Sequence, residues 1–198
     1  MLPTELTPTG LLEIFARFFE ARQIPYRVVG SMASMAYGEP RMTIDVDIVA
    51  DLTHSHVPEI LAQFLAPDYY VSETAALREA IVRRSQFNVI HIPSGLKVDV
   101  IVPPKSEFTV SEQSRVRRLS DQGEFSAWYA APEDVILNKL VYLQVSGGVS
   151  QKHLRDIGGM LKISGDIIDR DYIANWAAKL GVSDEWELVR QRVDKANP

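Results

Sequence analysis

Two segments of this chain alternate between apolar and other residues at every second position, and this pattern constrains the fold most. In Thr43–Ala50, Asp45 and Asp47 share one face, and in Leu96–Val102, Asp99 lies on the less apolar face. A period of two is the period of a half-buried β-strand, whose successive side chains point to opposite faces of a sheet. The sequence therefore predicts a sheet with one apolar face and one face that carries carboxylates.

The remaining sequence predicts an α+β fold followed by helices. The pattern before residue 125 indicates helices at 11–22, 32–37 and over most of 57–84, a strand at 26–29, and a hairpin of strands 86–92 and 96–102. From Pro132 onward it indicates helices at 132–144, 150–163, 169–180 and 183–193. We expect residues 1–125 to form an α+β core and residues 126–198 a helical region packed on it.

Composition excludes several kinds of site and partner. The 198 residues include no cysteine, which excludes disulfides and thiolate ligands, so any metal must bind to oxygen or imidazole. A net charge of −5 argues against broad, sequence-independent binding of nucleic acid. The longest apolar stretches are far shorter than the roughly 20 residues of a membrane span, so we expect a cytoplasmic protein with no membrane partner.

The paired acids in Thr43–Ala50 suggest a metal site. Two carboxylates on one strand face, with Cα atoms about 7 Å apart, need a counter-ion. Mg²⁺ takes such hard oxygen ligands and leaves other positions to water and phosphates, and Mn²⁺ is an alternative ion. Two ions can activate an attacking oxygen and stabilise a leaving pyrophosphate when a third carboxylate is near, and Asp99 is the candidate. The structural alternative is that Asp45 and Asp47 form the solvated face of an edge strand.

Gly30-Ser31 lies at a predicted strand-to-helix junction. Backbone N–H groups at a helix start favour anions, and glycine lets a phosphate approach closely. Arg41 and Thr43 stand just before the acids, where Arg41 would neutralise a phosphate and Thr43 would form a hydrogen bond near the metal. Each of these features is common by itself, since Gly-Ser also marks turns and helix caps.

The order of these motifs resembles the DNA polymerase β-like nucleotidyltransferase superfamily, which has a strand, Gly-Ser, a helix, Asp-x-Asp and a third Asp on a later strand. The segments 41–47, 131–140 and 150–157 look like those of bacterial nucleotidyltransferase toxins of the AbiEii type. This resemblance implies that Lys139 reaches the triphosphate and that Asp156 supports the site. Many of these relatives have an additional arginine between the last two segments, and Leu143–Val149 contains none.

The resemblance implies a nucleotidyltransferase-like mixed sheet flanked by helices and an enzyme that moves a nucleotide from a nucleoside triphosphate to an acceptor. The acceptor implied is RNA, including tRNA, or a protein, and the implied partner is an antitoxin. Two alternatives stay open. One is a glycosyltransferase that uses Asp-x-Asp, and the other is an inactive nucleotidyltransferase-like binding or regulatory protein.

Overall fold

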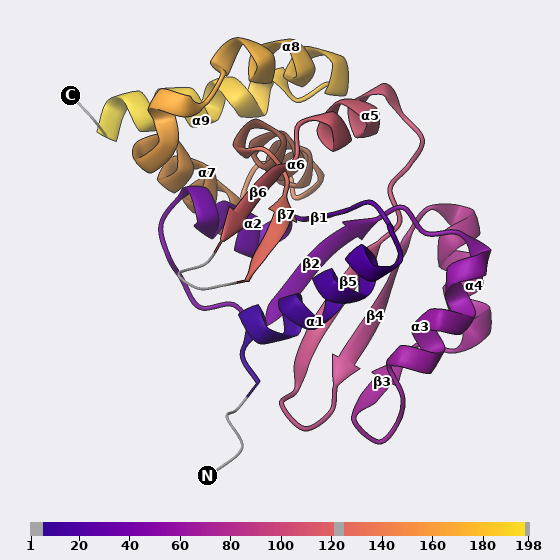
Figure 1. Ribbon diagram of the computed structural model, residues 1–198. Coiled ribbons are helices and arrows are strands. Elements are labelled where there is room, and N and C mark those ends of the chain that lie inside the picture. The colour runs from indigo at the N-terminus through magenta and orange to yellow at the C-terminus, as the bar shows by residue number, and fades with distance from the viewer. Residues whose placement is uncertain (1–5, 121–124, 197–198) are drawn as a thin grey trace. The chain divides into compact units, whose positions relative to one another are not determined.

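The computed structural model describes residues 6–120 and 125–196, which form two compact units (Figure 1). The first unit contains the residues up to Val29 together with Thr43–Tyr129. The second contains Gly30–Met42 together with the residues from Ala130 onward. The chain therefore leaves the first unit after one strand and returns to it at the segment that carries Asp45.

The described residues of the first unit form a seven-stranded mixed sheet, in the order β3-β4-β5-β2-β1-β7-β6. Its strands are β1 (Tyr26–Val28), β2 (Asp45–Ala50), β3 (Tyr69–Val71), β4 (Gln86–His91), β5 (Leu96–Ile101), β6 (Arg117–Ser120) and β7 (Ser126–Tyr129). β2 pairs with β1 antiparallel and with β5 parallel, and β1 also pairs with β7 in parallel. The predicted α+β class with a mixed sheet is confirmed.

One face of this sheet is the core of the first unit. Val46 and Ile48 of β2, with Val98 of β5, are fully buried, as the alternation predicts. Helix α1 (Pro8–Ala21) packs against β2 and β5 (Figure 1). Phe15 of α1 stacks on Phe64, with ring centroids 4.3 Å apart. This apolar layer fixes which strand residues point the other way, since a shift of register by one residue would bury the acids.

The other helices of the first unit are η1 (His54–His56), α3 (Val57–Gln63), α4 (Thr74–Arg83) and α5 (Glu107–Ser114). The sequence predicts a mostly helical segment at 57–84 with an interruption, and the structure places β3 at that interruption. α5, β6 and β7 have no counterpart among the predicted elements. These elements are short, and α5 has almost no apolar periodicity, so the sequence carries little signal for them.

A buried ion pair joins α5 to the polar face of the sheet. Arg27 of β1 donates to Glu112 of α5 at 2.6 Å, and the side chains of both are almost fully buried. Arg27 also donates to Gln113 at 3.2 Å. A buried charge of this kind requires its partner, so the contact specifies where α5 packs.

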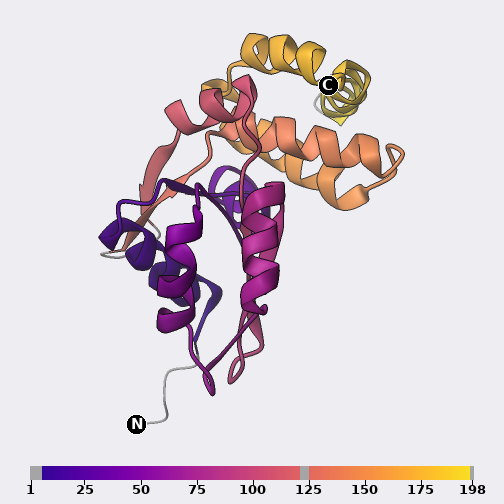
Figure 2. The same ribbon diagram turned by 90° about the vertical axis from the view of Figure 1, so that its right-hand side faces the viewer.

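The second unit is entirely helical within the described residues. It comprises α2 (Gly30–Tyr37), α6 (Pro132–Val145), α7 (Gln151–Ser164), η2 (Gly165–Ile167), α8 (Arg170–Leu180) and α9 (Ser183–Ala196). α6 and α7 lie side by side (Figure 2), and α2 packs against both. The sequence divides the chain at 125/126, whereas the first unit runs to Tyr129 and the second includes α2. The first unit extends to Tyr129 because β7 pairs with β1 and so belongs to the sheet.

Candidate functional site

The three aspartates predicted to bind metal lie on one face of the sheet in the first unit. β2 and β5 pair in parallel so that Asp47 stands opposite Asp99 and Asp45 stands opposite Lys97. Paired residues on neighbouring strands point to the same face, and the strands are about 4.8 Å apart. The backbone N–H of Val29 donates to the carbonyl of Asp47 at 2.9 Å, which continues the β1–β2 pairing beyond Val28. The sheet therefore brings together Asp47 and Asp99, which are 52 positions apart in the sequence.

Lys97 is a member of this acidic face. Its Nζ lies 2.8 Å from Asp99 Oδ2 and 3.6 Å from Asp45 Oδ1. The hydrogen bond to Asp99 raises the pKa of Lys97 above its ordinary value, and the charges of Asp99 and Asp45 add to this effect. Sequence reasoning did not select Lys97, although the alternation placed it on the same strand face as Asp99.

The oxygen donors of this face suit a hard divalent cation. Asp99 Oδ1 is buried and accepts no hydrogen bond within the described part of the chain. Such an orphan acceptor is costly unless something else binds it. Among the described residues, however, no three acidic or imidazole side chains are already gathered tightly enough to hold a metal ion. The donor chemistry fits Mg²⁺, while Lys97 supplies the positive charge at two of the three acids.

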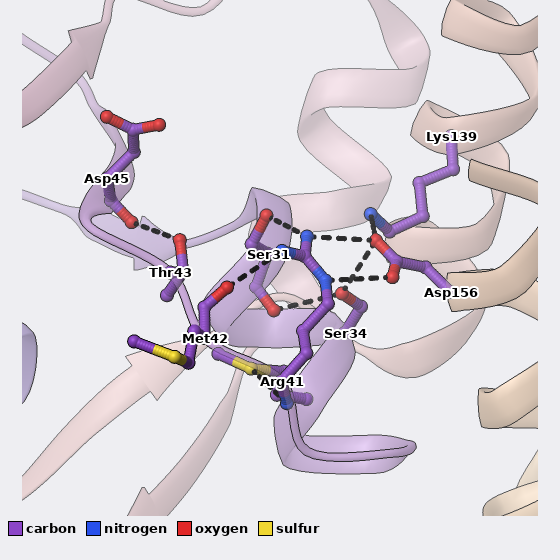
Figure 3. A network of polar contacts seen from close by, with 9 residues as sticks. Ser31, Ser34, Arg41, Met42, Thr43, Asp45, Lys139 and Asp156 are labelled. Atoms are coloured by element: carbon purple, nitrogen blue, oxygen red, sulfur yellow. Dashed lines mark hydrogen bonds and ion pairs between the residues drawn. The ribbon is translucent and has the colours of Figure 1, made fainter. Parts of the chain in front are cut away.

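Four of the other predicted residues meet in a polar network inside the second unit: Ser31, Arg41, Lys139 and Asp156 (Figure 3). Arg41 Nη2 donates to Ser31 Oγ, and Arg41 Nε donates to Asp156 Oδ1 at 3.1 Å. Lys139 Nζ donates to Asp156 Oδ2 at 2.7 Å. Ser34 Oγ donates to the carbonyl of Ser31 at 2.9 Å and lies 3.4 Å from Asp156 Oδ2. The segments that contribute to this network, 31–41, 139 and 156, come from three separate parts of the sequence.

Asp156 is the centre of this network. Burial acts to raise the pKa of Asp156, but the hydrogen bonds from Lys139 and Arg41 outweigh burial, and the pKa lies below its usual range. Burial lowers the pKa of Lys139, and the ion pair with Asp156 opposes that effect. Asp156 thus holds two cationic side chains in place, each of which is a donor suited to phosphate oxygens.

Gly30 begins α2 with a φ of 63°, in the left-handed region that favours glycine. Ser31, the next residue, is buried, and its hydroxyl accepts the hydrogen bond from Arg41. Thr43, in the first unit, donates from Oγ1 to the carbonyl of Asp45 at 3.2 Å (Figure 3). The side chain of Thr43 therefore ties down the start of β2.

An aromatic pair lies one helical turn away from Lys139 and Asp156. Tyr142, three residues after Lys139, stacks on His153, three residues before Asp156, with ring centroids 5.9 Å apart. Three residues forward on α6 correspond to three residues back on α7, because the two helices run antiparallel. Burial lowers the pKa of His153, and the positive charges of Lys139 and of Lys152 lower it further. Sequence reasoning assigned no role to His153, and spacing within one helix gives no signal for a pair made across two helices.

Solved structures of similar architecture exist. An antigenic nucleotidyltransferase-like protein from Paracoccidioides brasiliensis matches with a TM-score of 0.62 and 16% sequence identity, over 96% of this chain and 90% of that one. ANT(2'')-Ia, solved in complex with adenylyl-2''-tobramycin, matches with a TM-score of 0.52 and 13% identity, over 96% and 98%. The lincosamide antibiotic adenylyltransferase LnuA, solved with lincomycin bound, matches with a TM-score of 0.50 and 13% identity, over 81% and 99%.

This is a nucleotidyltransferase-like fold. No protein-family model matches the sequence, and a comparison with curated proteins gives no match. The fold therefore rests on the structural likeness, at identities where fold alone follows. Across residues 6–120 and 125–196, no helix has the length and apolar character to cross a membrane.

Proposed function

We propose that this chain is a metal-dependent nucleotidyltransferase that moves a nucleotide from a nucleoside triphosphate to an acceptor hydroxyl and releases pyrophosphate. One observation carries the proposal. In a nucleotidyltransferase-like fold, Asp47 and Asp99 stand opposite each other on neighbouring strands, and Asp45 shares their face. A solvated edge strand does not explain this arrangement, because β2 lies between β1 and β5 inside the sheet.

Asp45, Asp47 and Asp99 are the residues proposed to hold Mg²⁺, as two ions, with Mn²⁺ as a substitute. When bound, these ions supply positive charge to the phosphates and polarise the attacking hydroxyl. Among the described residues, no group donates to the buried Oδ1 of Asp99, which supports this assignment, because a carboxylate oxygen without a donor is available to a cation.

Gly30, Ser31, Arg41 and Lys139 are proposed to bind the outer phosphates of the nucleotide. Arg41 and Lys139 provide positive charge, and Asp156 positions both side chains without contacting the nucleotide. Thr43 acts on the metal-binding strand by fixing the backbone of Asp45. Most of the rate acceleration then comes from orientation and charge, which are the main sources of catalysis in phosphoryl transfer.

The proposed reaction is a substitution at the α-phosphorus of the nucleotide. The acceptor oxygen forms a bond to the α-phosphorus, and the bond from the α-phosphorus to the oxygen that bridges to the β-phosphorus breaks. Pyrophosphate leaves with that oxygen. The acceptor hydroxyl loses its proton, and Asp99 is the proposed first acceptor of that proton.

For the acceptor, the resemblance to AbiEii-type toxins favours an RNA end, such as that of tRNA, or a protein side chain. An antitoxin would then be a partner. A second candidate is a small hydroxylated antibiotic, because ANT(2'')-Ia was solved with adenylyl-2''-tobramycin and LnuA with lincomycin bound. The net charge of −5 favours a cationic small molecule over polyanionic RNA.

Two rival functions have less support. A glycosyltransferase is not expected to have the nucleotidyltransferase-like fold that the similar structures share. An inactive binding protein is favoured by one observation, that Lys97 already pairs with two of the three acids. Activity and binding must therefore be measured separately.

The decisive experiment is incubation of the purified chain with nucleoside triphosphates labelled at the α-phosphate, Mg²⁺, and either total cellular RNA or a panel of aminoglycosides and lincosamides. We expect label in one acceptor fraction and an equal amount of pyrophosphate. Label in no fraction, combined with no nucleotide binding by calorimetry, would overturn the proposal. Nucleotide binding without transfer would support the inactive alternative.

A further inference from the structure

Lys97 contacts two carboxylates of the acidic face, as a bound cation would. Its ammonium lies 2.8 Å from Asp99 Oδ2 and 3.6 Å from Asp45 Oδ1, so it bridges the two strands. The Lys97 side chain is one-third exposed (33%), and that of Asp45 is 44% exposed, whereas that of Asp99 is only 14% exposed. The bridge is thus open to solvent on the side of Asp45 and closed on the side of Asp99.

Repulsion between the carboxylates explains why a positive charge lies at this position. Carboxylates on neighbouring strands, with no cation between them, repel each other at close range in an environment partly shielded from water. Lysine is suited to a reversible role, because its ammonium is a point charge on a flexible four-carbon stem. An arginine would make a more rigid, two-pronged contact that is harder to release.

We infer that Lys97 is an internal counter-ion that occupies the position of a divalent cation beside Asp45 and Asp99, and that a metal ion must displace it in order to bind. This inference rests on the proposed function, since it concerns the same acids. It goes beyond that function by assigning a regulatory role to a residue outside the metal-binding set. In the metal-free protein Lys97 partly neutralises the acidic face, and metal binding requires this ammonium to move away.

Two measurable consequences follow for the metal-free protein. Replacing Lys97 with an uncharged residue removes the competing charge, so the affinity for a divalent cation rises. It also leaves the carboxylates uncompensated, so the variant is less stable without metal and recovers stability when metal is added.

The experiment uses the full chain and Mn²⁺, first without nucleotide and then with a non-hydrolysable nucleoside triphosphate. Mn²⁺ binding is measured by electron paramagnetic resonance of the free ion and by calorimetry, and thermal unfolding is recorded with and without Mn²⁺. The variants are Lys97→Met, Lys97→Gln and the charge-preserving Lys97→Arg. Lys105→Met, which removes an exposed lysine of the same unit, is the matched control.

For Lys97→Met and Lys97→Gln, we expect Mn²⁺ affinity to rise on the order of tenfold or more over wild type, with a larger increase in melting temperature on adding Mn²⁺. Lys97→Arg and Lys105→Met should bind Mn²⁺ no more tightly than wild type. The Gln variant keeps the test valid if the Met variant does not fold.

Equal or weaker Mn²⁺ binding by both uncharged variants overturns the inference while leaving metal dependence intact. If neither wild type nor any variant binds Mn²⁺, even with a nucleoside triphosphate present, the proposed function itself fails. The two results are distinguishable, because the inference can fail only if the wild-type protein binds Mn²⁺, with or without nucleotide, whereas the proposed function fails if it does not.

Discussion

Asp47 and Asp99 lie opposite each other on the parallel strands β2 and β5, although they are 52 positions apart in the sequence. Both side chains therefore point from the same face of the sheet.

Replacing Asp47 or Asp99 with asparagine should abolish nucleotide transfer while preserving the fold. We expect the transfer rate to fall by at least roughly 100-fold, since even residues that only support metal ligands cost 10–100-fold. Label transfer and circular dichroism check this prediction. The matched control is Asp51→Asn, which lies just after β2 and pairs with Arg84 at 3.0 Å, and which should retain near wild-type transfer. Equal losses in all three variants would contradict a specific role for Asp47 and Asp99.

Replacing Asp156 with alanine should destabilise the protein by roughly 3–5 kcal/mol, because it leaves Lys139 buried without a counter-charge. Urea unfolding measures the change. Exposed Asp166, replaced by alanine, is the control and should change stability by less than about 0.5 kcal/mol. The double variant Asp156→Leu with Lys139→Met should recover most of the loss, since it removes the carboxylate together with its buried partner, and Arg41 is partly exposed to solvent. A double variant as unstable as the single one would argue against charge as the cause.

The pKa of Asp156 also predicts a pH dependence. Because its pKa is lower in the folded protein than in the unfolded chain, the unfolded chain binds more protons in the interval between the two values. The stability from Asp156 is therefore fully present above about pH 4 and is lost as the pH falls through the folded value. Urea unfolding at a series of pH values should show this acid-dependent loss in wild type, and a smaller loss in Asp156→Asn. If the unfolding free energies of wild type and Asp156→Asn fall in parallel as the pH is lowered, Asp156 is not the source of the acid-dependent loss.

Replacing Glu112 with alanine should cost roughly 3–5 kcal/mol, because Arg27 would remain buried without the carboxylate that it contacts at 2.6 Å. Denaturant unfolding is the measurement. The control is Glu107→Ala at the exposed start of the same helix, where only a helix-dipole effect of about 0.3–1 kcal/mol is lost. Similar costs at both positions would mean that helix α5 itself, not the ion pair, is the sensitive feature.

Replacing Gly30 with alanine should destabilise the protein by about 1–2 kcal/mol, since the backbone at this position has a φ of 63°. Gly158→Ala is the opposite case, because Gly158 lies inside α7 with open space where a Cβ would stand. That change should stabilise the protein by about 0.5–1 kcal/mol. Thermal unfolding of the two variants tests the pair, and a shift in the same direction for both would contradict the backbone explanation.

Local pattern in the sequence was sufficient for the main strands and helices. Alternation identified β2, β4 and β5, and apolar spacing identified α1 and the helices from α6 to α9. β3, α5, β6 and β7 were missed because each is short and has no regular apolar pattern. Such segments become strands or helices through pairing with distant neighbours, which a local pattern does not record.

The sequence by itself determined which face of β2 and β5 carries carboxylates, because a strand turns every second side chain to the same side whatever surrounds it. Only the tertiary structure decided that β5 is the neighbour of β2, that Lys97 thereby reaches both Asp45 and Asp99, and that Asp156 gathers Arg41 and Lys139. Ion pairs depend on separations of a few ångströms between residues far apart in the chain, and the packing of the whole unit sets those separations.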